Sequence, residues 1–206
     1  MTMKKKLILK VVSNLPNDKT QGAGLTCLRP SYGSPFEVHF CSPNSREIPS
    51  RYVDNNIKFF DFISVNNILL QNFWVTKRLA QIIDNLFFLL LLLRIYRKDT
   101  PEVIICYGMV NFIGCYIFSR LKKIPLIVSF HNITEIKIYK KIKFIKKLLS
   151  RCLEIWVCSV ELLREIEKDL KIPIFYRPTG YDPEDFYNLK AVDRFEKHNL
   201  ISVGSF

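Results

Sequence analysis

Short apolar runs alternate with longer helical stretches along most of this 206-residue chain. The runs predict strands at Leu7–Ser13, Phe36–Cys41, Ile57–Ile63, Val103–Tyr107, Pro125–Phe130, Glu154–Cys158 and Ile172–Tyr176. Helices are expected between them, at Gln71–Arg97, Asn111–Leu121, Ile136–Arg151 and Val160–Leu170. Strands that alternate with helices in this way are typical of βαβ units. We therefore expect an α/β fold: a parallel sheet with helices on both faces.

Composition excludes several classes of protein. An apolar fraction of 49% with 16 Phe residues can fill a sizeable core, which excludes a disordered chain. The six cysteines are scattered singly, without a CxxC pair or a His cluster, so we expect neither a zinc site nor thiol redox chemistry. Reduced, buried cysteines favour a cytoplasmic setting. No Asp-x-Asp motif occurs in the sequence, and no metal ligand is predicted.

Two apolar segments could be taken for membrane-targeting elements. The run after Lys4, Lys5 and Lys6 is short, is interrupted by Lys10 and lacks a small-residue cleavage site, so a first strand is favoured over a signal peptide. The run Leu86–Leu93 lies in a stretch of fourteen residues that Asp84, Asn85 and Arg94 interrupt. A membrane span needs about 20 apolar residues, so a buried or interfacial helix is expected there.

The net charge of +12 points to a polyanionic partner, either nucleic acid or an anionic membrane. Much of the excess lies in the predicted helix Ile136–Arg151, which has no acid from residue 137 to 151. Its apolar stripe would be Ile138, Ile142, Ile145 and Leu149. A cationic amphipathic helix suits an anionic bilayer surface, whereas an ordinary sheet-covering helix usually mixes charges. The membrane-binding residues are predicted to be Lys137, Lys140, Lys141, Lys143, Lys146 and Lys147.

Candidate ligand-binding residues follow two of the predicted strands. Gly22 and Gly24 lie in the loop after the first strand, where glycine lets backbone N–H groups approach a diphosphate; a flexible loop without a ligand is the alternative. A nicotinamide fingerprint is disfavoured because a third glycine and an acid after the second strand are missing. His131 ends the strand Pro125–Phe130, at the edge where α/β sheets bind ligands. A lone histidine can equally be a structural residue.

The order of four motifs resembles the family 4 glycosyltransferases, which are retaining enzymes of the GT-B fold. The motifs are a glycine loop after the first strand (residues 21–24), a strand ending in His131, a strand ending in Ser159, and Pro178-Thr179-Gly180-Tyr181-Asp182 before a strand ending in Gly204. Thr179 stands where members have Asn. The resemblance implies a Rossmann-like N-terminal half of a GT-B fold over residues 1–187, a linker over 188–199, and the first strand of a missing C-terminal nucleotide-binding domain at 200–206.

The resemblance also implies a function: transfer of a sugar from a nucleotide-sugar donor to a lipid-linked or polysaccharide acceptor, in surface polysaccharide synthesis. His131 would face the donor sugar, Gly22 and Gly24 would contact the donor diphosphate, and no cofactor is implied. The protein would act in the cytoplasm, on the inner face of the plasma membrane. Without its C-terminal half, supplied in cis or in trans, this chain is expected to be inactive. An expression fragment, a frameshifted gene and one half of a two-chain enzyme would each explain its length.

Two functions of other classes stay open. A basic nucleic-acid-binding protein would carry the same net charge, but its cations would not gather on one amphipathic helix, and no recognised nucleic-acid module is present. No nucleic acid is therefore expected as a partner. The second is a non-catalytic membrane-surface protein that descends from a glycosyltransferase, in which His131 would have no role.

Overall fold

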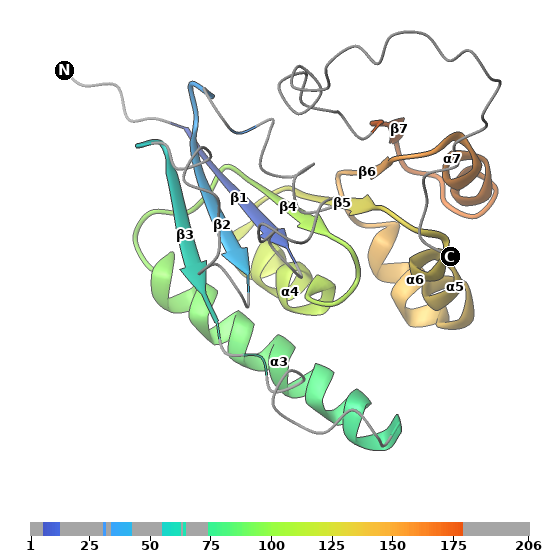
Figure 1. Ribbon diagram of the computed structural model, residues 1–206, viewed down its shortest axis with the longest axis horizontal. Helices are drawn as coiled ribbons and strands as arrows, with labels where there is room; N and C mark the ends of the chain where they lie inside the picture. The colour runs from blue at the N-terminus through green and yellow to red at the C-terminus, as the bar shows by residue number, and fades with distance from the viewer. Residues whose placement is uncertain are drawn as a thin grey trace, which may run out of the picture.

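The computed structural model describes residues 6–12, 31, 34–42, 55–62, 64 and 74–178 of the chain. Seven strands form one sheet in the order β3-β2-β1-β4-β5-β6-β7, and every neighbouring pair is parallel (Figure 1). The strands are β1 Leu7–Val12, β2 Glu37–Ser42, β3 Ile57–Asp61, β4 Val103–Tyr107, β5 Leu126–Phe130, β6 Glu154–Val157 and β7 Ile174–Tyr176. The predicted Rossmann-like parallel sheet is confirmed.

The described helices cover one face of this sheet. They are α3 Trp74–Ile95, α4 Phe112–Lys122, α5 Ile133–Lys141, α6 Lys143–Leu149 and α7 Val160–Glu167. All five contribute side chains to the same apolar core as alternate residues of the strands, such as Leu9 and Val11 of β1. The opposite face has an apolar cluster of its own, made by Val12, Val38, Phe40 and Ile57. The predicted linker at 188–199 and strand at 200–206 lie outside the described residues.

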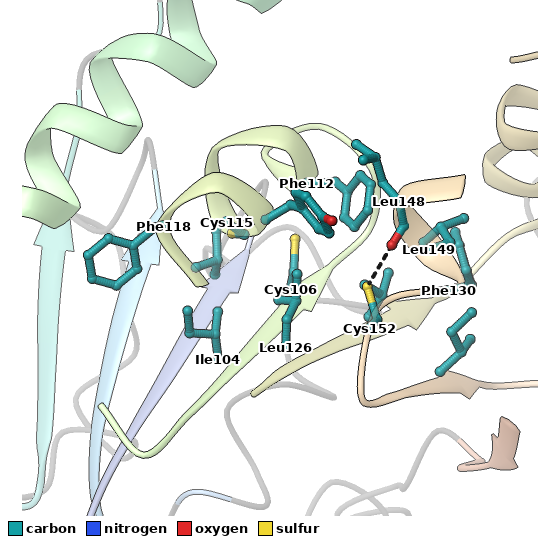
Figure 2. Close-up of a cluster of buried hydrophobic side chains, with 14 of the residues drawn as sticks. Ile104, Cys106, Phe112, Cys115, Phe118, Leu126, Phe130, Leu148, Leu149 and Cys152 are labelled. Atoms are coloured by element: carbon teal, nitrogen blue, oxygen red, sulfur yellow. Dashed lines mark hydrogen bonds between the residues drawn. The ribbon is translucent and has the colours of Figure 1, made fainter. Parts of the chain in front are cut away.

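The main core consists of aromatic and aliphatic side chains that pack around buried cysteines (Figure 2). Cys106 of β4, Cys115 of α4 and Cys152 before β6 are all buried and unbridged. Burial raises the pKa of the Cys152 thiol to about 12, and its Sγ–H donates to the backbone carbonyl oxygen of Leu148. These cysteines therefore act as small apolar side chains, as their isolated positions in apolar runs indicated.

The predicted basic helix Ile136–Arg151 is wrong as a single element, because the chain breaks at Ile142. That residue has extended backbone angles (φ −114°, ψ 94°) and separates α5 from α6. A continuous helix that buries Ile136 and Tyr139 would carry Lys143 and Lys146 onto the same buried face. The break resets the register, so that Ile145, Leu148 and Leu149 are buried instead. The predicted apolar stripe fails at Ile142, whose side chain is 42% exposed.

Two buried polar residues in the apolar part of α3 connect this helix to other segments. The Asn85 side chain donates to the backbone carbonyl oxygens of Gln81 and Val110, both at 2.8 Å, and accepts from the backbone N–H of Gly114 at 2.9 Å. It therefore caps the N-terminus of α4, whose own N-cap residue makes no side-chain cap. Gly114 allows this approach, since an added Cβ would lie 3.0 Å from the Asn85 carbonyl oxygen and from Phe88. Asp84, the other buried polar residue, accepts from Ser64.

Substitution Asn85→Ala should destabilise the domain by about 1–3 kcal/mol, because the Gly114 N–H and the Val110 carbonyl group lose their buried partner. Urea unfolding followed by circular dichroism would measure this change. Leu86→Ala is the matched control: its side chain is 56% exposed, and a change within about 0.5 kcal/mol is expected. Equal unfolding free energies for the two variants would show that Asn85 does not connect α3 to α4.

Candidate functional site

The carboxyl ends of β4, β5 and β6 lie side by side, because these strands are neighbours in the parallel sheet. Each leads through a short loop into a helix, α4, α5 or α7 respectively. Ligands of α/β sheets bind outside this edge. We refer to the three loops, residues 108–111, 131–132 and 158–159, as the carboxyl-edge loops.

His131 is the first residue after β5 and is held from several sides. Its ring stacks on the ring of Tyr107 from β4, with centroids 5.6 Å apart and an interplanar angle of 30°. Its Nε2 atom shares a hydrogen bond of 3.1 Å with the Ser129 hydroxyl group, and its backbone carbonyl oxygen accepts from the Cys158 thiol at 3.3 Å. Within the described part of the chain, Nδ1 forms no hydrogen bond. That nitrogen is the polar atom with which His131 can meet a ligand.

Burial lowers the pKa of His131, so that the imidazole ring is neutral at pH 7. A neutral imidazole ring has one N–H donor and one acceptor nitrogen. Nδ1 can therefore donate to a ligand hydroxyl group if Nε2 accepts from Ser129, or accept from one in the other tautomer. Either role suits binding of an uncharged hydroxyl group, and neither needs a charged histidine.

Glu135 of α5 joins the loops that surround His131. One of its carboxylate oxygens accepts from the backbone N–H of His131 at 2.9 Å and from that of Asn132 at 3.4 Å. The backbone N–H of Met109, in the loop after β4, also lowers the pKa of this carboxylate. Burial raises the pKa of Glu135, and the three backbone N–H groups act in the opposite direction. The Asn132 side chain in turn accepts from the backbone N–H groups of Thr134 and Glu135, which completes a capping box.

Gly108 makes room for the Glu135 carboxylate. Its φ of +79° lies in the left-handed region, which favours glycine. A Cβ at this position would collide with Oε1 of Glu135. The loop after β4 can therefore approach α5 closely only with glycine at position 108.

The structure describes one of the predicted ligand-binding residues, His131, but not the two glycines. His131 lies at the carboxyl end of β5, as expected. Gly22 and Gly24 lie outside the described residues, so their place on the same edge as His131 stays a prediction. Glu135 and Tyr107 were missed by the sequence reasoning. An Asn-x-x-Glu capping box directly after a strand, at 132–135, was the signal that could have found Glu135.

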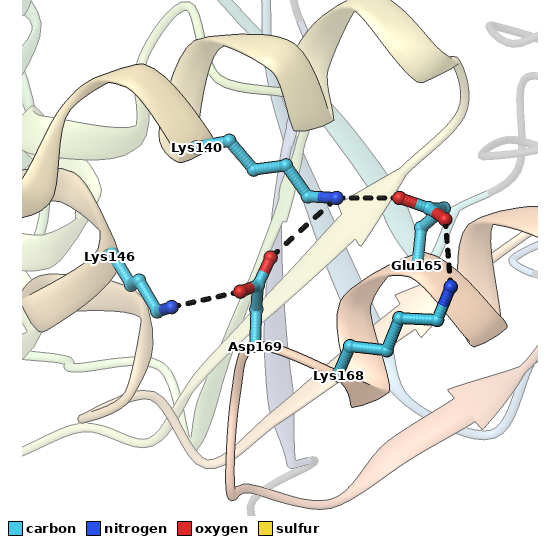
Figure 3. Close-up of polar contacts among 5 residues, drawn as sticks. All are labelled: Lys140, Lys146, Glu165, Lys168 and Asp169. Carbon is cyan, nitrogen blue, oxygen red and sulfur yellow. Dashed lines mark hydrogen bonds and ion pairs between the residues drawn. The ribbon is translucent and has the colours of Figure 1, made fainter.

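The six predicted membrane-binding lysines separate into two groups. Lys140 lies 2.5 Å from Glu165 and 3.7 Å from Asp169, and Lys146 lies 3.0 Å from Asp169 (Figure 3). These ion pairs connect α5 and α6 to α7 and to the turn that follows it. Exposed cations without an acidic partner among the described residues are Lys137, Lys141, Lys143 and Lys147. Acids of α7 and of the turn after it therefore neutralise part of the positive charge, although the sequence has no acid from residue 137 to 151.

No group of three or more His, Cys, Asp or Glu side chains among the described residues could hold a metal ion. Among the helices of the same part of the chain, none is long and apolar enough to cross a membrane.

The sequence matches no family model, and no curated protein matches it. Solved structures are similar in fold. Sucrose-phosphate synthase from Thermosynechococcus elongatus has a TM-score of 0.64 at 9% identity, over 87% of this chain and 49% of that protein. The glycotransferase of kitacinnamycin has a TM-score of 0.59 at 10% identity, over 95% and 55%. Phytolacca americana UGT2, complexed with UDP-2fluoro-glucose and pterostilbene, has a TM-score of 0.56 at 12% identity, over 85% and 54%.

The chain spans about half the length of these solved structures. At identities this low the likeness concerns the fold alone. It confirms the expected fold class, a Rossmann-like sheet of the kind found in GT-B glycosyltransferases.

Because burial lowers the pKa of His131 below the 6.5 of a free histidine, the unfolded chain binds a proton that the folded chain does not. Stability should therefore fall as the pH drops from about 7 through 6.5 toward the lowered pKa. His39, whose pKa burial also lowers, contributes in the same direction. We expect His131→Gln to lose less stability than the parent chain over this interval, measured as the urea unfolding free energy at each pH. An identical pH dependence in both proteins would contradict a buried, neutral His131.

Proposed function

We propose that this chain is the acceptor-side half of a glycosyltransferase that transfers a sugar from a nucleotide-sugar donor to an acceptor hydroxyl group. The observation that supports it best is His131: a neutral histidine at the carboxyl edge, with an open Nδ1 atom, in a fold that known glycosyltransferases share. The finer parts of the proposal are retention of the anomeric configuration, membership of family 4 and a lipid-linked or polysaccharide acceptor.

In the proposed reaction, an acceptor oxygen forms a bond to the anomeric carbon while the bond from that carbon to the donor diphosphate breaks. The diphosphate leaves with the bonding electron pair, and the acceptor hydroxyl proton passes to it or to solvent. His131 would hydrogen-bond a hydroxyl group of the donor sugar and hold the ring in place. A companion nucleotide-binding domain, in cis or in trans, would stabilise the leaving diphosphate, and closure of the two halves would assemble the site.

The outer surface of the helical layer supports the proposal of an anionic membrane as partner. On α3, which extends past the carboxyl ends of β1, β2 and β3 (Figure 1), five apolar side chains are more than half exposed: Leu79, Ile82, Leu86, Phe87 and Leu90. On α6, Phe144 is 61% exposed between exposed lysines. Exposed apolar side chains of this size indicate an interaction surface. Surrounding cations favour an anionic lipid surface, into which Ile142 and Phe144 would insert beside Lys141 and Lys143.

The transfer reaction can be tested with a panel of nucleotide sugars and lipid-linked acceptors, by measuring release of nucleoside diphosphate. We expect no turnover from this chain alone and turnover when a companion nucleotide-binding domain is joined to it. His131→Ala should then lower kcat by about 10²-fold or more, because a preorganised hydrogen bond to the reacting sugar is lost. His39→Gln is the control, since His39 bonds Tyr96 and Glu37 away from the carboxyl-edge loops. Full activity of His131→Ala would exclude the proposed role.

The membrane proposal predicts that neutralising Lys141, Lys143 and Lys147 together, each to Gln, weakens binding to vesicles that contain phosphatidylserine. Each lysine near an anionic surface contributes about 1 kcal/mol, so partitioning should fall about 100-fold. Cosedimentation with vesicles measures it. The control removes the same charge elsewhere, by Gln at Lys6, Lys58 and Lys168, which form ion pairs with acids. Equal losses in both variants, or binding to DNA but not to vesicles, would contradict the proposal.

A further inference from the structure

The Glu135 carboxylate does more than an ordinary helix cap requires. In a capping box, the acid at the third helical position accepts from the backbone N–H of the N-cap residue, here Asn132. That bond is the longer one, 3.4 Å, whereas the bond to His131, which precedes the cap, is 2.9 Å. The loop after β4 also reaches this carboxylate, because Gly108 lies against Oε1 and the Met109 N–H lowers the pKa of the acid. The carboxylate therefore connects the loop after β5 to the loop after β4.

This connection adds to the sheet ladder, in which the Gly108 N–H donates to the Ser129 carbonyl oxygen at 2.9 Å. Charge-assisted hydrogen bonds from backbone N–H groups to a carboxylate are shorter and stronger than neutral ones. Gly108 lies directly against Oε1, and a larger side chain there would displace the Glu135 carboxylate. A carboxylate on one side and a glycine on the other thus hold Tyr107-Gly108 close to His131 beyond the point where the ladder ends.

The His131 ring depends on that spacing because its contacts come from both loops and both strands. Tyr107, which precedes Gly108, stacks on the ring, and Ser129 of β5 bonds Nε2. Cys158, after β6, donates to the His131 backbone carbonyl oxygen. Glu135 holds the remaining backbone polar group, the His131 N–H. If the Glu135 bonds were lost, Tyr107 and His131 would move relative to each other.

We propose that Glu135 is a positioning residue, whose partly buried carboxylate holds the loops after β4 and β5 together and so directs Nδ1 of His131 toward a ligand at the carboxyl edge. The identity of the ligand, a sugar hydroxyl group, rests on the proposed function. The positioning of His131 by Glu135 does not rest on it and can be tested on this chain without any activity.

The test is NMR of the histidine rings and the backbone amides in the full chain. The sequence has only three histidines, so the His131 ring signals can be assigned by substitution. In Glu135→Gln the carboxylate becomes a neutral amide, so the charge-assisted bonds from the backbone N–H groups of His131 and Asn132 weaken. We expect changed ring ¹⁵N shifts of His131, weaker ring contacts with Tyr107, and amide exchange of His131 and Asn132 faster by about tenfold or more.

Three further variants make the result specific. Gly108→Ala disturbs the same contact from the opposite loop and should also shift the His131 ring signals, which keeps the test decisive if Glu135→Gln does not fold. Asn132→Ala removes the other half of the capping box but leaves the Glu135 bonds, so the His131 ring should not change. Glu37→Gln is the matched acid control: its carboxylate bonds His39, and the His39 signals alone should respond.

The outcomes separate the inference from the proposed function. Unchanged His131 ring signals in Glu135→Gln and Gly108→Ala, or an equal change in Asn132→Ala, would overturn the positioning role. In the chain joined to its companion domain, Glu135→Gln should lower kcat about tenfold with KM little changed, since only orientation of the reacting sugar is affected. A correct NMR result with no sugar transfer by the parent protein would reject the proposed function and leave the role of Glu135 intact.

Discussion

The all-parallel sheet is the constraint on which every other feature depends. Parallel strands need crossover connections, so each strand enters from the same edge and ends at the other. The carboxyl ends of β4, β5 and β6 therefore meet, and residues from three separate segments reach one place. A parallel sheet also needs both of its faces buried, and each face of this sheet has an apolar cluster. Polar residues that remain inside, such as Asn85 and Glu135, are there because they bond backbone groups that burial would otherwise leave unpaired.

Much of this arrangement could be predicted from the sequence, because hydrophobic periodicity is a local signal. The strand Val103–Tyr107 has the predicted bounds. Ser159, directly before α7, caps that helix by accepting from the backbone N–H of Leu162. His131 could be located because strand ends are local too. The break at Ile142 could not, since it depends on whether Lys143 would be buried by a core that other segments build. The acids that pair with Lys140 and Lys146 lie on α7 and in the turn after it, about twenty-five residues away, so a local sequence pattern does not show them.

The role of Glu135 was hidden for a related reason. Its pattern with Asn132 is visible in the sequence, but a capping box normally concerns one helix only. Contact with the loop after β4 arises from the close approach at Gly108, which is a property of two neighbouring strands. Positioning residues of this kind act through the backbone of another residue, so the sequence spacing shows the cap but not the second loop that the carboxylate contacts. Catalytic candidates are easier to recognise than the groups that hold them.

The contact between Asn85 and Gly114 has a consequence for how this domain can diverge in sequence. An amide with three hydrogen bonds and a glycine against its backbone form one unit, although 29 residues separate them along the chain. A larger residue at 114 would push α4 away from α3, and an apolar residue at 85 would leave the first turn of α4 without its cap. Substitution at either position is therefore tolerable only with a compensating change at the other. Related chains, when aligned, should exchange these two residues as a pair.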